Sequence, residues 1–291
     1  MSDHRDDDHA PARTREPFGA RLRAAVDGRG PLCVGIDPHP ALMDAWGLTD
    51  SVNGLEKFAL SATEALAPEV AAVKPQSAFF ERFGSRGVEV LERVVRTARE
   101  AGALVVLDVK RGDIGSTAQA YAEAYLDPRS PVAVDAVTVS PYLGFGSLDP
   151  FLSTAREHGT GVFVLALTSN PEAASYQQAR TSDGSTVAGS VLAELARLND
   201  GAAPMGDFGA VVGATIGETQ EDLAVNGPLL VPGIGAQGGT ADDVRRIFGD
   251  VLDLVLPTSS REILGRGPNA GALHDAVGEA LTAFAALRGP S

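Results

Sequence analysis

The chain has 291 residues, of which 44% are hydrophobic, and its formal net charge at pH 7 is −14. This much apolar sequence can bury a large core, either in one large α/β domain or in two ordinary ones. The acidic balance argues against a nucleic-acid partner, because phosphate backbones are bound by basic faces and the chain has no stripe of Lys and Arg. An anionic small molecule could still bind in a locally positive pocket.

Residues 1–15 are dense in charge and contain no apolar segment of the kind found in a signal peptide. We expect a disordered acidic tail here and a catalytic domain over residues 16–291. Cys33 is the single cysteine, which excludes a disulfide framework and indicates a reducing, cytoplasmic location. No apolar run approaches the ~20 residues that a membrane helix needs, so we expect a soluble protein without a membrane partner. The five histidines are scattered without metal-ligand spacing, and we predict no metal site.

The remaining chain alternates between apolar runs and segments with helical spacing, after a first short helix at 16–30. Strands are expected at residues 31–37, 70–76, 103–110, 136–141, 161–168, 209–215, 229–235 and 251–260. Helices are expected at residues 54–69, 88–102, 116–126, 148–159, 189–199, 219–225, 240–250 and 272–288.

Nearly continuous apolar strands separated by helices predict a parallel sheet that is covered on its faces. Eight such units in a chain of this length favour a closed (β/α)8 TIM barrel, in a single α/β domain, over an open doubly wound sheet. The number of strands alone does not exclude the open sheet. In a barrel, polar residues at the carboxyl ends of the strands face the active-site mouth.

Charged residues stand at several of these strand ends. Asp37 ends the first strand, Lys74 lies near the end of the second, and Asp108 and Lys110 end the third. Side chains two apart in a strand point to the same side, so Asp108 and Lys110 can form an ion pair in the mouth. Buried charges are a poor source of stability, which favours a functional role for this array over a structural one. Asp113 follows in the loop, where it could curl back toward the lysine or reach a neighbouring subunit.

The stretch VVLDVKRGDIGSTA resembles the signature of the orotidine 5′-phosphate decarboxylase family. In that signature an Asp-x-Lys-x-x-Asp core is followed by Ile or Val and, three positions on, by Thr. The matching residues here are Asp108, Lys110, Asp113, Ile114 and Thr117. Four further blocks resemble the family in the right order, namely AVKPQSAFFERFG, LTSNP, VPGIGAQGG and SSREIL.

The resemblance implies conversion of orotidine 5′-phosphate to uridine 5′-phosphate and CO2, with no metal and no organic cofactor. It implies that Lys110 is the proton donor and that Asp108 lies near the departing carboxylate. It also implies that Lys74 and Asp113 complete the charged network, with Asp113 supplied by the partner subunit. A homodimer with shared active sites would follow.

The resemblance also implies contacts to the rest of the nucleotide substrate. Asp37 would accept the ribose hydroxyls, Thr117 would reach the ribose from the neighbouring chain, and Ser169 would meet the pyrimidine edge. Ile114 and Pro232 would form apolar walls. Arg261 and Gln237, with backbone N–H groups near Gly235 and Ser260, would hold the phosphate, at the loops where barrels commonly bind phosphate.

Two departures from the commonest pattern are visible. The long connection at residues 169–186 suggests the longer, type 2-like subgroup and leaves its path and any lid role open. Arg261 follows two serines where many relatives have a glycine.

Two alternative functions stay open. A metal-dependent sugar-phosphate decarboxylase or synthase on the same scaffold would carry a glutamate near the end of the second strand, where this chain has Lys74. A non-catalytic barrel that binds a phosphate ligand would lack one of the four charged residues, and all four are present.

Overall fold

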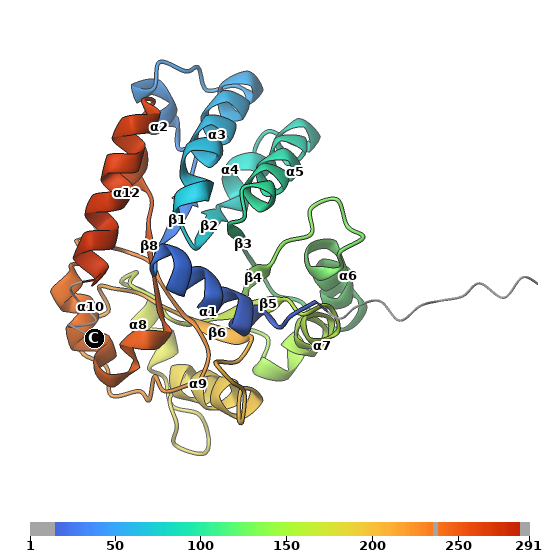
Figure 1. The fold of residues 1–291 in the computed structure, drawn as a ribbon. Helices are drawn as coiled ribbons and strands as arrows, with labels where there is room; N and C mark the ends of the chain where they lie inside the picture. Colours follow the sequence, from blue (N-terminus) through green and yellow to red (C-terminus); the bar gives the residue numbers. More distant parts are fainter. Residues whose placement is uncertain (1–14, 235–237, 286–291) are drawn as a thin grey trace, which may run out of the picture.

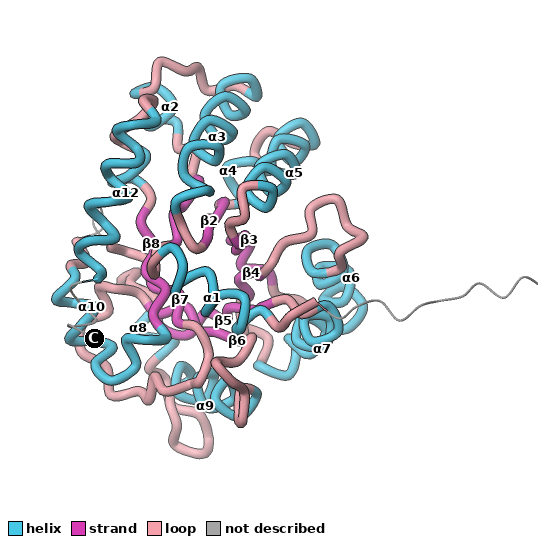
Figure 2. The backbone as a smooth tube through the Cα atoms, in the orientation of Figure 1, coloured by secondary structure: helices cyan, strands magenta, loops and turns pink. Residues whose placement is uncertain are grey.

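The predicted single (β/α)8 barrel is confirmed by the computed structural model, which describes residues 15–234 and 238–285. Eight parallel strands close on themselves in sequence order, with β1 hydrogen-bonded to β8. Figures 1 and 2 show the strands in the middle of the molecule and the helices around them. The strands are β1 Cys33–Ile36, β2 Ala72–Pro75, β3 Leu104–Arg111, β4 Ala136–Val139, β5 Gly161–Leu167, β6 Phe208–Val212, β7 Leu229–Val231 and β8 Val255–Ser259.

Helices cover the outside of this sheet. Those longer than one or two turns are α1 Phe18–Arg29, α3 Val52–Leu66, α5 Ser85–Glu100, α6 Gly115–Leu126, α7 Asp149–His158, α9 Val187–Leu198, α10 Ala241–Phe248 and α12 Ala270–Ala285. Shorter ones are α2 Pro40–Ala45, α4 Ser77–Glu81, α8 Ala173–Gln177, α11 Arg261–Leu264 and the 3-10 turns Ala67–Glu69, Phe145–Leu148 and Gly249–Leu254. Most of the buried apolar side chains lie between this outer layer and the strands.

Helix α1 closes the amino-terminal end of the barrel. Its fully buried Phe18 packs edge-on against Phe163 of β5, with ring centroids 5.9 Å apart. Gly161 makes this contact possible, because a Cβ at that position would lie 2.3 Å from the Phe18 ring. Figure 1 shows α1 crossing in front of the strands. The base of the barrel is therefore filled by apolar side chains, and any open space must lie at the other end.

The alternation of strand residues explains which side chains enter the barrel. Cys33, Ala72 and Leu104 belong to the inner apolar cluster near the base, whereas Val34, Val73 and Val105 belong to the outer one. Since side chains two apart share a face, the inward series in β2 continues to Lys74 and that in β3 to Asp108. Burial raises the pKa of the Cys33 thiol to about 12, which keeps this inner side chain uncharged.

Strand β3 is irregular where it carries the charged residues. Leu107 is paired with Val137 of β4, but the next paired residue of β3 is Arg111, opposite Val139. Three residues of β3 thus face one residue of β4, Thr138, which makes a β-bulge at the carboxyl end of the strand. The strand predicted at residues 103–110 is therefore interrupted near its carboxyl end.

The helix predicted at residues 219–225 is wrong. This segment between β6 and β7 is an irregular loop in which Leu223 and Val225 are nevertheless buried. The hydroxyl of Thr219 accepts a hydrogen bond from the N–H of Glu221, and the Asp222 carboxylate accepts one from Ala224. Local bonds of this kind compete with helix formation.

The long connection at 169–186 folds as α8 followed by a turn, and a bridge between Arg180 and Thr186 leads the chain into α9. Residues 1–14 of the predicted tail lie outside the described residues, so the boundary at residue 15 stays a prediction. Over the described ranges, no helix is both long and apolar enough to span a bilayer.

Candidate active site

A cavity of about 220 Å³ opens at the carboxyl ends of the strands. It is the place where a parallel barrel gathers side chains from strands that are distant in sequence. Its lining residues are Gly35, Asp37, Lys74, Gln76, Asp108, Lys110, Pro232, Gly233, Ile234, Thr258, Ser259, Ser260 and Arg261. The structure thus brings together seven of the predicted site residues, namely Asp37, Lys74, Asp108, Lys110, Pro232, Ser260 and Arg261.

The centre of the site is the Asp108 carboxylate, which is held between two ammonium groups. Lys74 Nζ lies 3.0 Å from Oδ2, and Lys110 Nζ lies 2.5 Å from Oδ1. Oδ1 also accepts a hydrogen bond of 2.8 Å from the Thr138 hydroxyl. The side chains of Lys74 and Asp108 are 9% and 8% exposed, whereas that of Lys110 is 45% exposed. Lys74 is therefore a fixed buried cation, and Lys110 presents its ammonium to the open cavity.

The charges of the buried pair stabilise each other. Burial raises the pKa of Asp108, but the nearby Lys74 and Lys110 ammoniums outweigh burial and hold this pKa well below its ordinary value. Burial lowers the pKa of Lys74, but the carboxylates of Asp108 and Asp37 outweigh it and raise this pKa above the ordinary value. Both groups are therefore ionised at neutral pH, as a preorganised electrostatic site requires.

The backbone around Lys110 is unusual as well. Its φ angle is +46°, in the left-handed region that non-glycine residues rarely adopt. The following residue, Arg111, is anchored outside the cavity by an ion pair of 2.6 Å with Glu81 of α4. On the neighbouring strand, the Gln76 amide donates a hydrogen bond of 3.4 Å to the Asp108 carbonyl. The end of β3 is thus held from both sides while its lysine turns into the cavity.

The far side of the cavity carries polar atoms that have no partner within the described residues. These atoms are Asp37 Oδ1 and the hydroxyls of Ser259 and Ser260, all of them buried. A Cβ at Gly35 would come within 2.8 Å of both Asp37 and Ser260, so glycine leaves room between them. Unpaired buried oxygens are costly unless a ligand or water satisfies them. The Arg261 side chain lies beside them at the start of α11 and is exposed.

The remaining predicted residues do not line this cavity. Asp113, Ile114 and Thr117 lie in the loop after β3 and the first turn of α6, and Ile114 is 63% exposed. Among the described residues no ion pair of Asp113 is found, and its carboxylate accepts the N–H of Ile114. Ser169 lines a separate cavity of about 210 Å³ between the loops after β5 and β6. Gly235 and Gln237 lie outside the described residues.

Gln76 and Thr138, which contact Asp108, were not predicted from the sequence. Gln76 could have been found by alternation, because it lies two residues after Lys74 and shares its face. Thr138 could not, since a single hydroxyl near a strand end is common and its direction depends on local irregularities.

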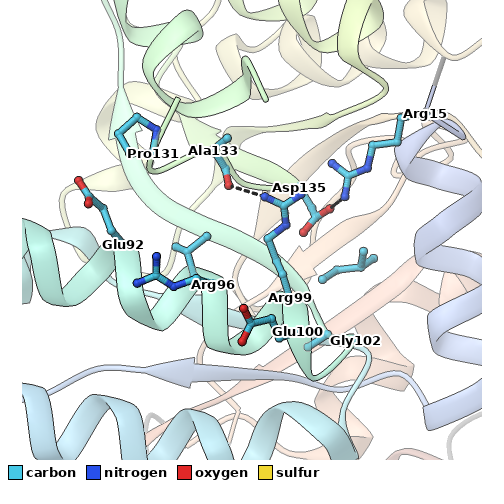
Figure 3. Close-up of a pocket in the computed structure, with 12 residues that line it drawn as sticks. Arg15, Glu92, Arg96, Arg99, Glu100, Gly102, Pro131, Ala133 and Asp135 are labelled. Atoms are coloured by element: carbon cyan, nitrogen blue, oxygen red, sulfur yellow. Dashed lines mark hydrogen bonds and ion pairs between the residues drawn. The ribbon is translucent and has the colours of Figure 1, made fainter. Parts of the chain in front are cut away.

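A larger cavity, of about 620 Å³, lies at the opposite end of the barrel. Figure 3 shows Arg15 pointing to Asp135 on one side of it and Arg99 pointing to the Ala133 carbonyl. Asp135 is 1% exposed and also pairs with Arg21 of α1 at 2.6 Å. The ion pairs of Asp135 fasten α1 and the chain before it to the barrel, and the Arg99 hydrogen bond fastens α5 to the segment before β4. Size alone therefore does not identify the functional cavity, and the one at the carboxyl ends of the strands holds the reactive groups.

Comparison with known proteins identifies the family of the chain. The profile of the "Orotidine 5'-phosphate decarboxylase / HUMPS family" matches residues 30–276. The chain belongs to this family. The matched range contains every lining residue of the carboxyl-end cavity. No group of three or more His, Cys, Asp or Glu side chains placed to hold a metal ion is found in the described ranges.

Relatives within the orotidine 5′-phosphate decarboxylase / HUMPS family cover nearly the whole chain. An orotidine 5′-phosphate decarboxylase of a Nocardioides species is 67% identical over 251 residues, which are 85% of this chain and 92% of the relative. One from Salinispora tropica is 64% identical over 267 residues, which are 91% of this chain and 96% of the relative. A crystal structure of a candidate orotidine 5′-phosphate decarboxylase from Streptomyces avermitilis superposes with a TM-score of 0.93. It is 56% identical and covers 96% of this chain and 98% of its own.

Proposed function

We propose that the protein is an orotidine 5′-phosphate decarboxylase that forms uridine 5′-phosphate and CO2 without a metal or organic cofactor, in the de novo synthesis of UMP. The observation that carries the proposal is the Asp108 carboxylate between the ammoniums of Lys74 and Lys110, beside a cavity with unpaired hydroxyls. The family membership and the names of the relatives support it.

The reaction breaks the bond between C6 of the pyrimidine and its carboxylate carbon. The electron pair stays on C6, and the resulting carbanion has no adjacent carbonyl to delocalise it. Fixed positive charge must therefore stabilise it. Attraction between an ammonium and the carbanion ~4 Å apart, at an effective dielectric of about 20, lowers the barrier by ~4 kcal/mol. This corresponds to roughly three powers of ten in rate.

Lys110 is the group that can supply this charge and then a proton. Its ammonium is exposed to the cavity and oriented by Asp108 at 2.5 Å. An N–H proton of Lys110 passes to C6, and the neutral amine regains a proton from water. Asp108 stands beside the departing carboxylate, and Lys74 keeps Asp108 ionised. Because both partners are already in place before substrate binds, little reorganisation is needed in the transition state.

The other side of the cavity suits the sugar phosphate. Asp37 has a free carboxylate oxygen for ribose hydroxyls, and Ser260 and Arg261 stand where the phosphate would lie. An arginine fork binds phosphate through two parallel hydrogen bonds. Gln237 and the backbone at Gly235 are proposed to complete this grip. Pro232 supplies an apolar wall.

Asp113, Ile114 and Thr117 are proposed to act in the active site of a second copy of the chain. Their loop begins beside the segment that follows β4, since a Cβ at Gly112 would lie 2.6 Å from the Ser140 carbonyl oxygen. Tyr142 and Leu143 are 69% and 51% exposed, and the Tyr142 ring packs on that of Tyr176 at 5.5 Å. Clusters of exposed apolar side chains commonly mark interfaces. A homodimer would cover them, with Ser169 brought toward the pyrimidine as the loops around it close.

The decisive experiment follows the absorbance of orotidine 5′-phosphate with the wild type and with Lys110→Ala. We expect the variant to stay folded, because Lys110 is half exposed, and to lose at least about 10²- to 10⁴-fold in kcat, the range of general acid catalysis. A variant with wild-type turnover would remove Lys110 from the mechanism. A wild type without turnover would contradict the proposed function.

The shared site is tested by mixing two inactive variants, Asp113→Ala and Lys74→Ala. A mixed dimer would contain one site with neither substitution. Random exchange makes about half of the dimers mixed, so we expect up to about a quarter of the activity of the wild-type dimer to return. Absence of recovery, with subunit exchange demonstrated by mass, would show that Asp113 acts within its own chain.

The family also includes enzymes with other reactions, and a metal-dependent sugar-phosphate decarboxylase or synthase is the second candidate. A divalent ion at the end of β2 would meet the Lys74 ammonium, and like charges in a buried site repel. Activity that disappears with EDTA and returns with Mg2+ would favour this candidate. The assignments to the longer subgroup, to a barrel domain over residues 16–291 and to the cytoplasm belong to the same proposal.

A further inference from the structure

The bulge in β3 needs a hydrogen-bond partner that β4 does not provide through its backbone. Between the pairs Leu107–Val137 and Arg111–Val139, three residues of β3 face Thr138 alone. The N–H groups of Val109 and Lys110 therefore have no regular position in the ladder. Both donate instead to the Thr138 hydroxyl oxygen, at 3.1 Å and 3.0 Å.

The Thr138 hydroxyl is used to its full capacity. It accepts the two backbone N–H groups and donates its own proton to Asp108 Oδ1 at 2.8 Å. A hydroxyl has one donor and two acceptor positions, so all three are occupied. The side chain is 1% exposed, and Thr138 is not among the residues that line the cavity. It can therefore influence a bound molecule only through Asp108 and Lys110.

The same hydroxyl fixes both charged residues relative to each other. It stabilises the bulge in which Lys110 has a φ of +46°, a conformation that costs free energy in a non-glycine residue. It also holds the carboxylate oxygen that pairs with Lys110 Nζ. A regular β3 would instead keep its N–H groups in the ladder and carry Lys110 along the strand direction.

We propose that Thr138 is a positioning residue. Its hydroxyl holds the bulge of β3 and thereby keeps the Lys110 ammonium and the Asp108 carboxylate in the relative position that the reaction needs. This inference rests on the proposed decarboxylase function for its kinetic consequence. Its structural content, the dependence of the Lys110 conformation on one hydroxyl, does not.

The test compares Thr138→Val with Thr138→Ser. Valine keeps the branched shape and removes the hydroxyl, whereas serine keeps the hydroxyl. Thr160→Val is a matched control, because Thr160 is 2% exposed, lies at the other end of the barrel, and its hydroxyl has no partner within the described part of the chain. Steady-state kinetics with orotidine 5′-phosphate and calorimetric binding of UMP are measured for each.

We expect T138V to lose about 10- to 100-fold in kcat, as for one or two lost hydrogen bonds to charged or buried groups. Its Kd for UMP should change less than about threefold, since the phosphate and ribose contacts lie on other strands. T138S should stay within about threefold of the wild type, as should T160V. Equal kcat in T138V and wild type, or equal losses in T138S and T138V, would overturn the inference. If T138V does not fold, Thr138→Ala replaces it in the comparison. Equal kcat values in T138A and T138S would then overturn the inference.

A crystal structure of T138V, or of T138A, gives a readout that does not depend on turnover. We expect Lys110 to leave its left-handed conformation and its Nζ to move away from Asp108. An unchanged β3 would refute the positioning role even if the wild type decarboxylated the substrate. A changed β3 in a protein that is inactive on orotidine 5′-phosphate would contradict the proposed function alone.

Discussion

Replacing Asp108 by asparagine would leave two ammonium groups next to a neutral amide. Asp108 lies 3.0 Å from Lys74 Nζ and 2.5 Å from Lys110 Nζ. Lys110 is 45% exposed and can turn to water, but Lys74 is 9% exposed and cannot. The uncompensated buried charge in D108N is therefore that of Lys74.

The expected cost follows from this burial. Removing one partner of a buried ion pair costs about 3 to 5 kcal/mol. The Asp37 carboxylate still favours the charged form of Lys74, and the asparagine oxygen can accept one hydrogen bond. We therefore expect D108N to lose about 3 kcal/mol of unfolding free energy at pH 7, at the lower end of that range.

The loss should depend on pH with a definite sign. In the wild type the pKa of Lys74 is raised, so its contribution to stability is complete below the unfolded value of about 10.4. In D108N only one carboxylate, that of Asp37, still opposes the effect of burial on Lys74. The pKa of Lys74 in the folded protein then falls below its pKa in the unfolded chain. The unfolded state then binds more protons, and stability rises with pH. The D108N deficit should therefore shrink as pH rises toward the unfolded pKa of lysine, about 10.4.

Asp135→Asn is the matched control. Asp135 is 1% exposed and pairs with Arg21 and Arg15, so its partners are guanidinium groups and not an amine. D135N should also be destabilised, but its deficit should not shrink as pH rises. Urea unfolding followed by circular dichroism at pH 7, 8.5 and 10 measures both variants against the wild type. A D108N deficit that is absent at pH 7, or that stays constant with pH like that of D135N, would refute the reasoning.

Two further predictions concern the ends of the barrel. Arg261→Ala should lower kcat/KM for orotidine 5′-phosphate by about 10- to 100-fold, the value of a charge-assisted phosphate contact. Steady-state kinetics with orotidine, which lacks the phosphate, should show no such difference if Arg261 binds the phosphate. At the base, Arg21→Ala should cost about 3 kcal/mol, because Arg21 is 13% exposed and pairs with buried Asp135, whereas Arg15→Ala should cost about 1 kcal/mol or less. Thermal unfolding of the two variants compares them, and equal shifts in Tm would contradict the difference.

Alternation along the strands was sufficient to place Lys74, Asp108 and Asp37, whereas the direction of Lys110 depends on the bulge of β3. Lys74 and Asp108 each continue an inward-facing series, and Asp37 follows the inward Gly35. These positions depend only on the two-residue period and on the closure of the barrel, which eight strand and helix units make favourable. The fold class and the cavity lining near the strands were therefore predictable.

Local irregularities were not predictable in the same way. The bulge of β3 is hydrogen-bonded to one hydroxyl on a different strand, and AVTV in β4 has the composition of any buried strand. TQEDLAV has apolar residues at helical spacing, yet side-chain hydrogen bonds from Thr219 and Asp222 hold it as a loop. Ser169 lines a cavity between the loops after β5 and β6 and not the one that holds Asp108. Its direction depends on the long connection after β5, which the strand pattern does not specify. The spacing of apolar residues along the sequence carries no information about individual contacts of this kind.

Barrel closure has a consequence for protein synthesis. β1 meets β8 through the pairs Cys33–Thr258 and Val34–Ser259, and the residues just beyond this seam are Asp37 on one side and Ser260 on the other. Residues through Ser260 must therefore be synthesised before the two sides of the seam, which we propose hold the sugar and the phosphate of the substrate, can come together. A nucleotide that bridged the closed seam in the proposed way would bind the folded barrel alone and stabilise the newly made protein by mass action.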